Sequence, residues 1–303
     1  MKSFHSNAIP SQKGKTAIVT GSNTGLGFET AKMFAEKEIE VIMACRDKEK
    51  AEQAKKEIVK DIPEAQIHIE ELDLASISSV SSFSMRITEK YKKLDFLINN
   101  AGVMMPPFST TKDGFELQMG VNFLGHFLLT GLLLNTLNKA DHARIVTLSS
   151  IAHKSGEIQF DDLHWKKKYS KTKAYGQSKL ACLMFAFTLD RKLKKDNHST
   201  ISVASHPGVS NTDLARHLPK WLLFLAKPII PFMTQSPKEG AMPTIRASFD
   251  NEVEGGMYIG PQGKKEMKGV PGKAEVASQA KEEKTQIELW KRAEKELDYT
   301  FEV

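Results

Sequence analysis

The sequence has few cysteines and no long apolar run, and each shortage narrows the class of protein. Only two of its 303 residues are cysteine, Cys45 and Cys182. This number excludes a disulfide framework and predicts two small core residues in a reducing compartment. The most apolar segments, 123–134 and 221–233, are shorter than the roughly 20 apolar residues of a membrane span. We therefore expect a soluble, cytoplasmic protein.

Other features are missing as well. The first fifteen residues are polar and lack the apolar region of a secretory signal. No low-complexity tract, linker or fixed repeat divides the chain, so we predict a single domain. The net charge of +6 is mild, and the lysine clusters near 166–173, 192–195 and 264–273 lack stacked aromatics. These clusters predict a solvated surface and no nucleic-acid partner. We predict no metal site.

Apolar strand patterns alternate with amphipathic helical patterns along the chain. About seven strands separated by helices predict an α/β fold with an open, doubly wound parallel sheet of the Rossmann type. The irregular stretches are 151–173 and 262–284. The expected strands are 16–19, 40–45, 66–72, 95–99, 144–148, 200–205 and 255–259, and the expected helices are 28–37, 48–60, 77–91, 114–138, 175–193, 237–248 and 283–298.

A glycine-rich turn, Thr20-Gly-Ser-Asn-Thr-Gly-Leu-Gly27, joins the first strand to the first helix. A turn of this kind gathers backbone N–H groups at one point, which favours phosphate. Gly21 permits a tight turn, Gly25 lets a pyrophosphate approach the backbone, and Gly27 lets the helix pack close to the sheet. The turn therefore predicts a nucleotide site.

Polar residues end the next two strands. Arg46 and Asp47 stand where a carboxylate favours the ribose of NAD and an arginine favours the 2′-phosphate of NADP. Asp47 can also be the N-cap of helix 48–60, whereas Arg46 has no such structural role, so NADP(H) is favoured and NAD(H) is the alternative. Asp73 either accepts from the adenine amino group or caps the helix that begins near Ser76. Both interpretations of Asp73 stay open.

Residues suited to acid–base chemistry follow. Asn122 lies in an apolar helix, where it is either a structural hydrogen bonder or part of a polar site. Tyr175 and Lys179 are four residues apart on one helix face. Tyrosine is a poor base at neutral pH, but a nearby ammonium and an oxidised nicotinamide ring favour the phenolate. Tyr175 can then exchange a proton with an alcohol or carbonyl whose oxygen Ser150 holds. An exposed helical pair is the alternative for Tyr175 and Lys179.

Taken together, these motifs resemble the short-chain dehydrogenase/reductase family. The resemblance covers about residues 13–259 and rests on Thr20-Gly-x-x-x-Gly-x-Gly27, Asn99-Asn-Ala-Gly102, Asn122, Ser150, Tyr175-x-x-x-Lys179 and Pro207-Gly208. Within the family, segments 44–47, 99–105 and 121–127 are similar to the branch of retinol dehydrogenases and the WW-domain oxidoreductase. The 25-residue step from Ser150 to Tyr175 is also similar to that branch.

The resemblance implies hydride transfer with NADP(H) or NAD(H) by a tetrad of Asn122, Ser150, Tyr175 and Lys179. In this family Tyr175 would be the acid/base, Lys179 would bind the nicotinamide ribose, Ser150 would hold the substrate oxygen, and Asn122 would support a water-linked proton relay. Ser149 is rejected because the family's serine is usually the second of the pair. The implied cofactor contacts are Gly21, Ser22, Gly25, Leu26, Gly27, Arg46, Asp73, Leu74, Asn99, Ala101, Gly102, Tyr175, Lys179, Pro207, Gly208 and Val209.

The expected organisation is an N-terminal extension at 1–12, a Rossmann-type domain at 13–262 with a substrate lid at about 209–238, and a C-terminal loop and helix at 263–303. Because the apolar segment 218–232 would overlie the substrate in this family, we predict an NADP(H)-dependent oxidoreductase of lipophilic alcohols or carbonyls. That segment could equally be a core or dimer contact. The alternatives are a nucleotide-binding redox sensor or interaction protein with little turnover, and peripheral membrane contact through 221–232. A homo-oligomer is compatible with the resemblance.

Overall fold

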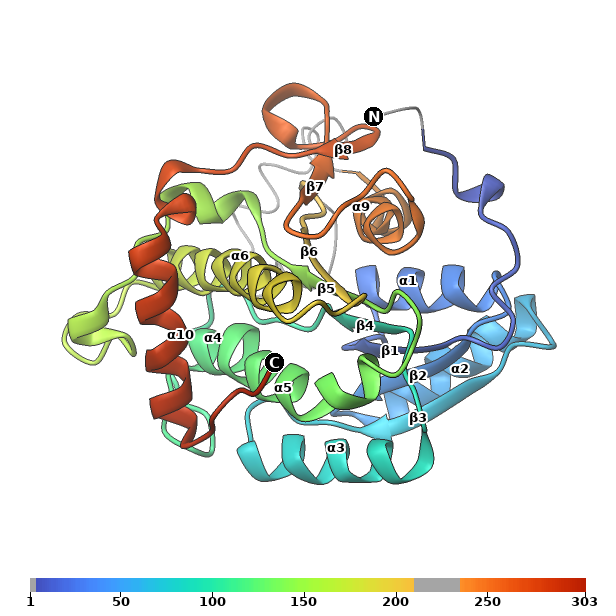
Figure 1. Cartoon of the computed structure of the whole chain (residues 1–303), viewed down its shortest axis with the longest axis horizontal. Helices are drawn as coiled ribbons and strands as arrows, with labels where there is room; N and C mark the ends of the chain where they lie inside the picture. Colours follow the sequence, from blue (N-terminus) through green and yellow to red (C-terminus); the bar gives the residue numbers. More distant parts are fainter. Residues whose placement is uncertain (1–3, 210–234) are drawn as a thin grey trace.

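One sheet with helices on both faces makes up the protein (Figure 1). The computed structural model describes residues 4–209 and 235–303. Its strands are β1 Thr16–Thr20, β2 Glu40–Cys45, β3 Ile67–Glu71, β4 Phe96–Asn99, β5 Arg144–Leu148, β6 Ile201–Ser205, β7 Tyr258–Pro261 and β8 Pro271–Lys273. Its helices are α1 Gly25–Ala35, α2 Lys48–Asp61, α3 Ile77–Lys90, α4 Leu117–Met119, α5 Gly125–Leu137, α6 Lys171–Lys195, α9 Pro237–Phe249 and α10 Glu283–Leu297.

The strands lie in the order β3-β2-β1-β4-β5-β6-β7-β8, and all neighbours are parallel except β7 and β8. The chain therefore builds outward from β1 to β3 and then returns to place β4 on the other side of β1. Ligands of open α/β sheets bind at the carboxyl ends of the strands beside such a reversal. The predicted doubly wound α/β fold is confirmed, and β1 and β4 locate its crevice.

Strand alternation divides the apolar residues between the two faces. Ile18 packs into a core with α3, α5, α6 and α10, while its neighbours Ala17 and Val19 pack into a second core with α1, α2 and α9. Both cores are needed because successive side chains of a strand point to opposite faces. Cys45 and Cys182 are buried free thiols, as predicted.

The eighth strand is one more than the sequence indicates. Strand β8 lies in the stretch 262–284 that is predicted as irregular, and it pairs antiparallel with β7 over only three residues. Its sequence, Pro271-Gly-Lys273, carries no strand pattern. Strand β7 also begins later than predicted, because Gly255 lies in a turn packed against the carboxylate of Asp190.

The predicted helix 114–138 begins at Leu117 and contains a π turn at Gly120–Leu124. By length and composition, Leu117–Leu137 is the one helix among the described residues that could cross a membrane, and 89% of its most apolar window is buried in the fold. That burial is typical of a core helix. The second apolar segment, 221–233, lies outside the described residues, and the cytoplasmic location stays a prediction.

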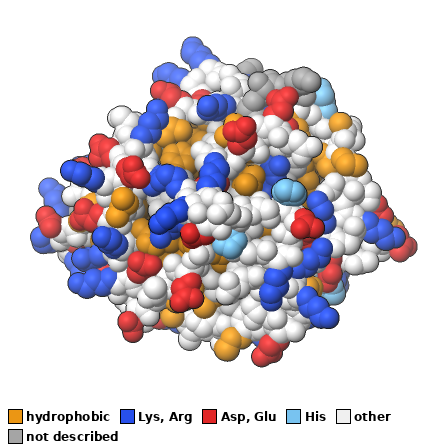
Figure 2. Space-filling model, viewed as in Figure 1, with side chains coloured by type: hydrophobic (Ala, Val, Ile, Leu, Met, Phe, Trp, Pro, Cys, Tyr) orange, Lys and Arg blue, Asp and Glu red, His pale blue; other side chains and the backbone are white. Residues whose placement is uncertain are grey.

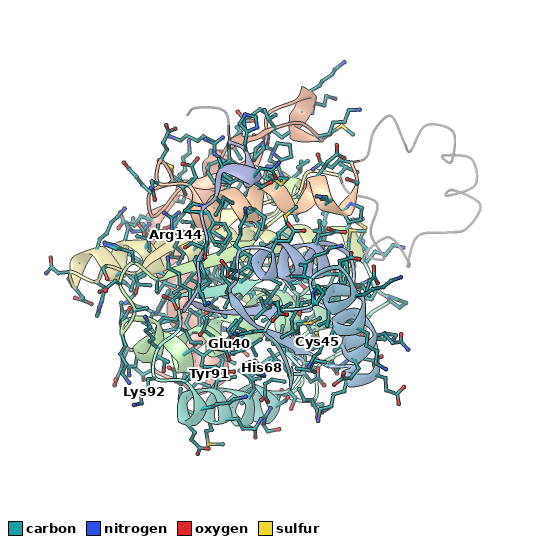
Figure 3. The ribbon with its side chains drawn as sticks, turned by 90° about the vertical axis from the view of Figure 1, so that its right-hand side faces the viewer. Glu40, Cys45, His68, Tyr91, Lys92 and Arg144 are labelled. Carbon is teal, nitrogen blue, oxygen red and sulfur yellow. The ribbon has the colours of Figure 1, made fainter. Side chains whose placement is uncertain are left out.

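The two edges of the sheet differ in character. Figure 3 labels Glu40 at the start of β2 and Cys45 at its carboxyl end. At the amino edge the Glu40 carboxylate accepts from the Tyr91 hydroxyl at 3.0 Å and lies 3.1 Å from His68.

On the face that carries α10 and α6, basic and acidic side chains are interspersed (Figure 2). Mixed charge of this kind agrees with the solvated surface predicted for the lysines.

Candidate functional site

The glycine turn after β1 leaves no room for a side chain at Gly21 or Gly27. Gly21 has a φ of +62°, in the left-handed region that favours glycine. A Cβ at Gly27 would lie against the carbonyl oxygen of Gly21 and 2.5 Å from the side-chain nitrogen of Asn100. Gly27 therefore lets α1 begin directly beside the sheet, as the sequence predicts.

Helix α1 begins inside this turn, at Gly25 rather than at Phe28. Its N-cap residue Thr24 makes no side-chain capping hydrogen bond. The first amides of a helix need an acceptor, and a phosphate is a suitable one. Beside them, the Ser22 hydroxyl donates to the carbonyl of Val19.

The two charged residues that follow β2, Arg46 and Asp47, have different roles. Asp47 caps α2, because its carboxylate accepts from the amide of Lys50 at 3.1 Å and pairs with the Lys50 ammonium at 2.8 Å. Arg46 is exposed and forms no ion pair with any residue that the structure describes. The structural alternative for Asp47 is thus observed, while Arg46 stays available to a ligand.

Asp73, after β3, does not cap α3. The N-cap is Ser76, whose side chain accepts from the amide of Ser79. Asp73 instead accepts from the amide of Ala75 at 3.1 Å and lies 3.3 Å from the Lys112 ammonium. The adenine contact stays a prediction. The next residue, Leu74, is buried with its carbonyl oxygen against Gly125.

The loop after β4 is tied to the glycine turn through Thr20. The Thr20 hydroxyl oxygen accepts from the amides of Asn100 and Ala101, each at 2.9 Å, and the Asn100 side chain donates to the carbonyl of Thr20 at 2.7 Å. Asn99, by contrast, directs its side chain into the interior, where it donates to Thr130 at 3.0 Å. A nucleotide contact by Asn99 would therefore use its backbone.

Asn122 lies in the π turn between α4 and α5, with its side-chain amide and its backbone carbonyl engaged. Its side chain accepts from the amide of Val103 at 2.8 Å and donates to the carbonyl of Val103 and the hydroxyl of Ser178. Its backbone carbonyl lies 3.0 Å from Nδ1 of His126 and accepts from the Cys182 thiol at 3.1 Å. These contacts make Asn122 a structural hydrogen bonder, and its part in a proton relay stays a prediction.

The serines after β5 have different surroundings. Ser149 is buried, and its hydroxyl donates to the carbonyl of Lys179 at 2.7 Å, so it has a structural role. The Ser150 oxygen accepts from the amide of Ala152 at 3.2 Å. Its hydroxyl proton reaches no acceptor within the described part of the chain. Of the two, Ser150 is therefore the one free to donate to a ligand.

Tyr175 and Lys179 lie on the first turns of α6, which begins at Lys171, and both are 5% exposed. The Lys179 ammonium donates to the carbonyl of Leu148 at 3.0 Å. It also lies 3.5 Å from where a Cβ on Gly102 would be. The Tyr175 hydroxyl makes no hydrogen bond to a described residue. Burial rules out the exposed-pair alternative.

The turn after β6 approaches the same edge. Gly208 has a φ of +66°, and the amide of Val209 donates to the carbonyl of Met267 at 2.8 Å. The side chain of Gln235 donates to the carbonyl of Pro207 and accepts from the amide of Gly269 at 3.3 Å. The lid segment beyond Val209 falls mostly on 210–234, outside the described residues.

Four polar residues that sequence reasoning did not assign hold these segments together. Thr20 and Asn100 were within quoted motifs, so their neighbourhood gave a signal. His126 also lies in the segment 121–127 that carries the resemblance. The contacts of His126 with Thr20 and of His153 with the amide of Ala277 gave no signal, because they join residues distant in sequence. The four are Thr20, Asn100, His126 and His153, the last with Nδ1 2.7 Å from the carbonyl of Ser150.

Comparison with known proteins agrees with this arrangement. The family description short chain dehydrogenase matches residues 15–223. Retinol dehydrogenase 13 of Homo sapiens is 45% identical over 246 residues, which cover 79% of this chain and 73% of that protein. A structure of a putative uncharacterised protein from Mycobacterium paratuberculosis has a TM-score of 0.83 at 35% identity, covering all of both chains.

A more distant structure shares the fold. The Pseudomonas aeruginosa RhlG/NADP active-site complex has a TM-score of 0.65 at 22% identity and covers 82% of this chain and 94% of that one. The retinol dehydrogenases and the family match together assign an oxidoreductase that acts on CH–OH donors. The chain thus belongs to the short-chain dehydrogenase/reductase family, in its retinol-dehydrogenase-like branch.

Proposed function

We propose that the protein transfers hydride between NADP(H) and a lipophilic alcohol or carbonyl compound, with Tyr175 as the acid/base. The observation that carries this proposal is that the Lys179 ammonium is buried with few partners. The residue is 5% exposed, and its ammonium donates to one backbone carbonyl and pairs with no carboxylate of the described residues. A buried cation with so few partners is costly. A bound nucleotide would supply the missing acceptors.

Other features support a dinucleotide at the same edge. The start of α1 has no side-chain cap, and Gly27 leaves no room between the turn and Asn100. These groups fit a pyrophosphate at the glycine turn. Strands β4 and β5 separate the Pro207–Val209 turn from the glycine turn. The Pro207–Val209 turn would lie along the nicotinamide end of the nucleotide.

When bound, the nicotinamide accepts or gives a hydride. Tyr175 would give its phenolic proton to a carbonyl oxygen in reduction, or accept the proton of an alcohol in oxidation. Lys179 would favour the phenolate by its positive charge and hold a ribose hydroxyl. The Ser150 hydroxyl would donate to the substrate oxygen as negative charge develops there. Asn122 would hold the Val103 backbone and α6 in place.

The preference for NADP(H) is proposed from the end of β2. Arg46 is exposed without an ion pair to a described residue, while Asp47 is engaged as a helix cap. An arginine can pair with a 2′-phosphate, and a carboxylate occupied by its own helix is poorly placed to accept from a ribose. The NADP complex of the RhlG structure is consistent with this preference.

The lipophilic substrate is proposed from the relatives, which are named for retinol. The test follows NADPH oxidation by the purified protein with a panel of apolar aldehydes and ketones that includes retinaldehyde. We expect turnover with at least one apolar carbonyl, and faster turnover than with short polar ones. Tight NADPH binding without turnover on the whole panel would favour the redox sensor instead.

A further inference from the structure

A buried histidine outside the proposed chemistry connects three parts of the site. His126 lies on α5, four residues after Asn122, and is 1% exposed. Its Nδ1 lies 3.0 Å from the carbonyl oxygen of Asn122, and its Nε2 lies 2.9 Å from the hydroxyl of Thr20. The ring thus spans from the π turn to the end of β1.

The chemistry of the partners fixes the direction of each hydrogen bond. A carbonyl oxygen only accepts, so Nδ1 of His126 must carry the proton. Burial lowers the pKa of His126 to about 4, and the ring is therefore neutral at physiological pH. Nε2 then has a lone pair and, at 2.9 Å, is the nearer acceptor for the Thr20 hydroxyl proton, whose other acceptor is the Ile98 carbonyl at 3.3 Å. The lone pairs of Thr20 are left for the amides of Asn100 and Ala101.

These contacts close a triangle between three segments. One side joins the glycine turn to the loop after β4, through Thr20 and Asn100. A second joins that loop to the π turn, through Val103 and Asn122. His126 forms the third side, from the π turn back to Thr20. A triangle with all three sides holds its corners in one arrangement, whereas two sides leave a hinge.

We propose that His126 is a positioning residue that fixes the glycine turn, the loop after β4 and the π turn relative to one another. The inference rests on the proposed function, because these segments are the ones assigned to hold the nucleotide and support Tyr175. Preorganised amides bind an anion without first paying an ordering entropy. Loss of the third side should therefore weaken nucleotide binding more than it weakens the fold.

Three substitutions separate the two hydrogen bonds. His126→Leu removes both and keeps the site apolar. His126→Asn places an amide nitrogen near the position of Nδ1, so it can keep the bond to Asn122. His126→Gln places an amide oxygen near the position of Nε2, so it can keep the bond to Thr20. Leu193→Ala, at the far end of α6, is a control that removes buried volume away from the strand ends.

The experiment measures NADPH affinity by fluorescence titration and amide exchange of peptides across residues 96–105 in nucleotide-free protein. We expect His126→Leu to weaken NADPH binding about tenfold, the effect of one net hydrogen bond. Exchange of the Asn100 and Ala101 amides should quicken. His126→Gln should restore much of the NADPH affinity and slow the exchange again, because it keeps the hydrogen bond to Thr20. Leu193→Ala should lower the melting temperature and change neither.

Equal affinity and equal exchange in wild type and His126→Leu would overturn the proposal and leave His126 as core packing. If the leucine variant does not fold, the asparagine and glutamine variants decide by the same readouts. If the wild type binds no NADPH, the proposed function fails. The exchange of Asn100 and Ala101 then still tests the positioning role on its own.

Discussion

Replacement of Lys179 by methionine should stabilise the nucleotide-free protein. The change removes a buried ammonium that has one described hydrogen bond, to Leu148, and no carboxylate partner in the described residues. Relief of the buried charge is worth several kcal/mol, and loss of a charged hydrogen bond costs about 1.5–3 kcal/mol. We expect a net gain of about 1–2 kcal/mol. In a domain of this size that is a rise of roughly 2–6 °C in melting temperature.

A second lysine on the same helix provides a control of opposite sign. Lys194 lies 2.7 Å from the Asp190 carboxylate, whose side chain is 3% exposed. Lys194→Met leaves that buried carboxylate without its ammonium, so we expect a loss of about 1–2 kcal/mol. Methionine has a side-chain volume similar to that of lysine. The difference between the two variants in free energy of unfolding therefore reports the electrostatic surroundings of each lysine.

The assay is thermal unfolding with and without NADPH. Nucleotide at 100 times its Kd should stabilise wild type and Lys194→Met by about 2.7 kcal/mol. Lys179→Met should gain little, so that NADPH reverses the order of wild type and Lys179→Met. The reasoning is refuted if Lys179→Met is less stable than wild type without nucleotide, or if NADPH stabilises both equally.

Three further predictions follow from named contacts. Gly27→Ala places a Cβ against Gly21 and Asn100 and should cost about 1–3 kcal/mol in unfolding experiments and weaken NADPH binding. Gly114→Ala is the control: it has open space around it but a φ of +86°, so it should lower stability through backbone strain and leave binding unchanged. Arg46→Ala should raise the KM for NADPH much more than that for NADH, and equal changes would contradict the 2′-phosphate contact. Because the folded pKa of His126 is about 4 and the unfolded value about 6.5, the unfolded state binds the proton first as pH falls. Stability should decline by about 3 kcal/mol between pH 7 and 4, and His126→Leu should flatten that slope in pH-dependent denaturation.

Much of the fold follows from local pattern. Strand β2 lies at its predicted residues, Glu40–Cys45, because a run of buried apolar residues between helices has few alternatives in an α/β chain. Strand β8 could not be predicted, since a three-residue edge of proline, glycine and lysine is stabilised by its pairing with β7 rather than by propensity.

The candidate site also has some features that the sequence predicts and others that it does not. Gly27 and Asp47 were predictable, because a close approach at a turn and a helix cap depend on near neighbours in sequence. The π turn around Asn122 and the link from His126 to Thr20 were not. They depend on contacts between elements far apart in the chain, as does the inward direction of the Asn99 side chain. Sequence motifs identified the segments of the site, and tertiary contacts decided how each side chain serves it.

Transfer of deuterium from labelled NADPH tests the central claim most directly. The purified protein is incubated with NADPH carrying deuterium at the transferred position and an apolar aldehyde, and the alcohol is analysed by mass spectrometry. We predict a singly deuterated alcohol from wild type, and a loss of on the order of 100-fold or more in Tyr175→Phe, which should still bind NADPH. An unlabelled alcohol, or equal labelling by Tyr175→Phe, would contradict the assignment of this site.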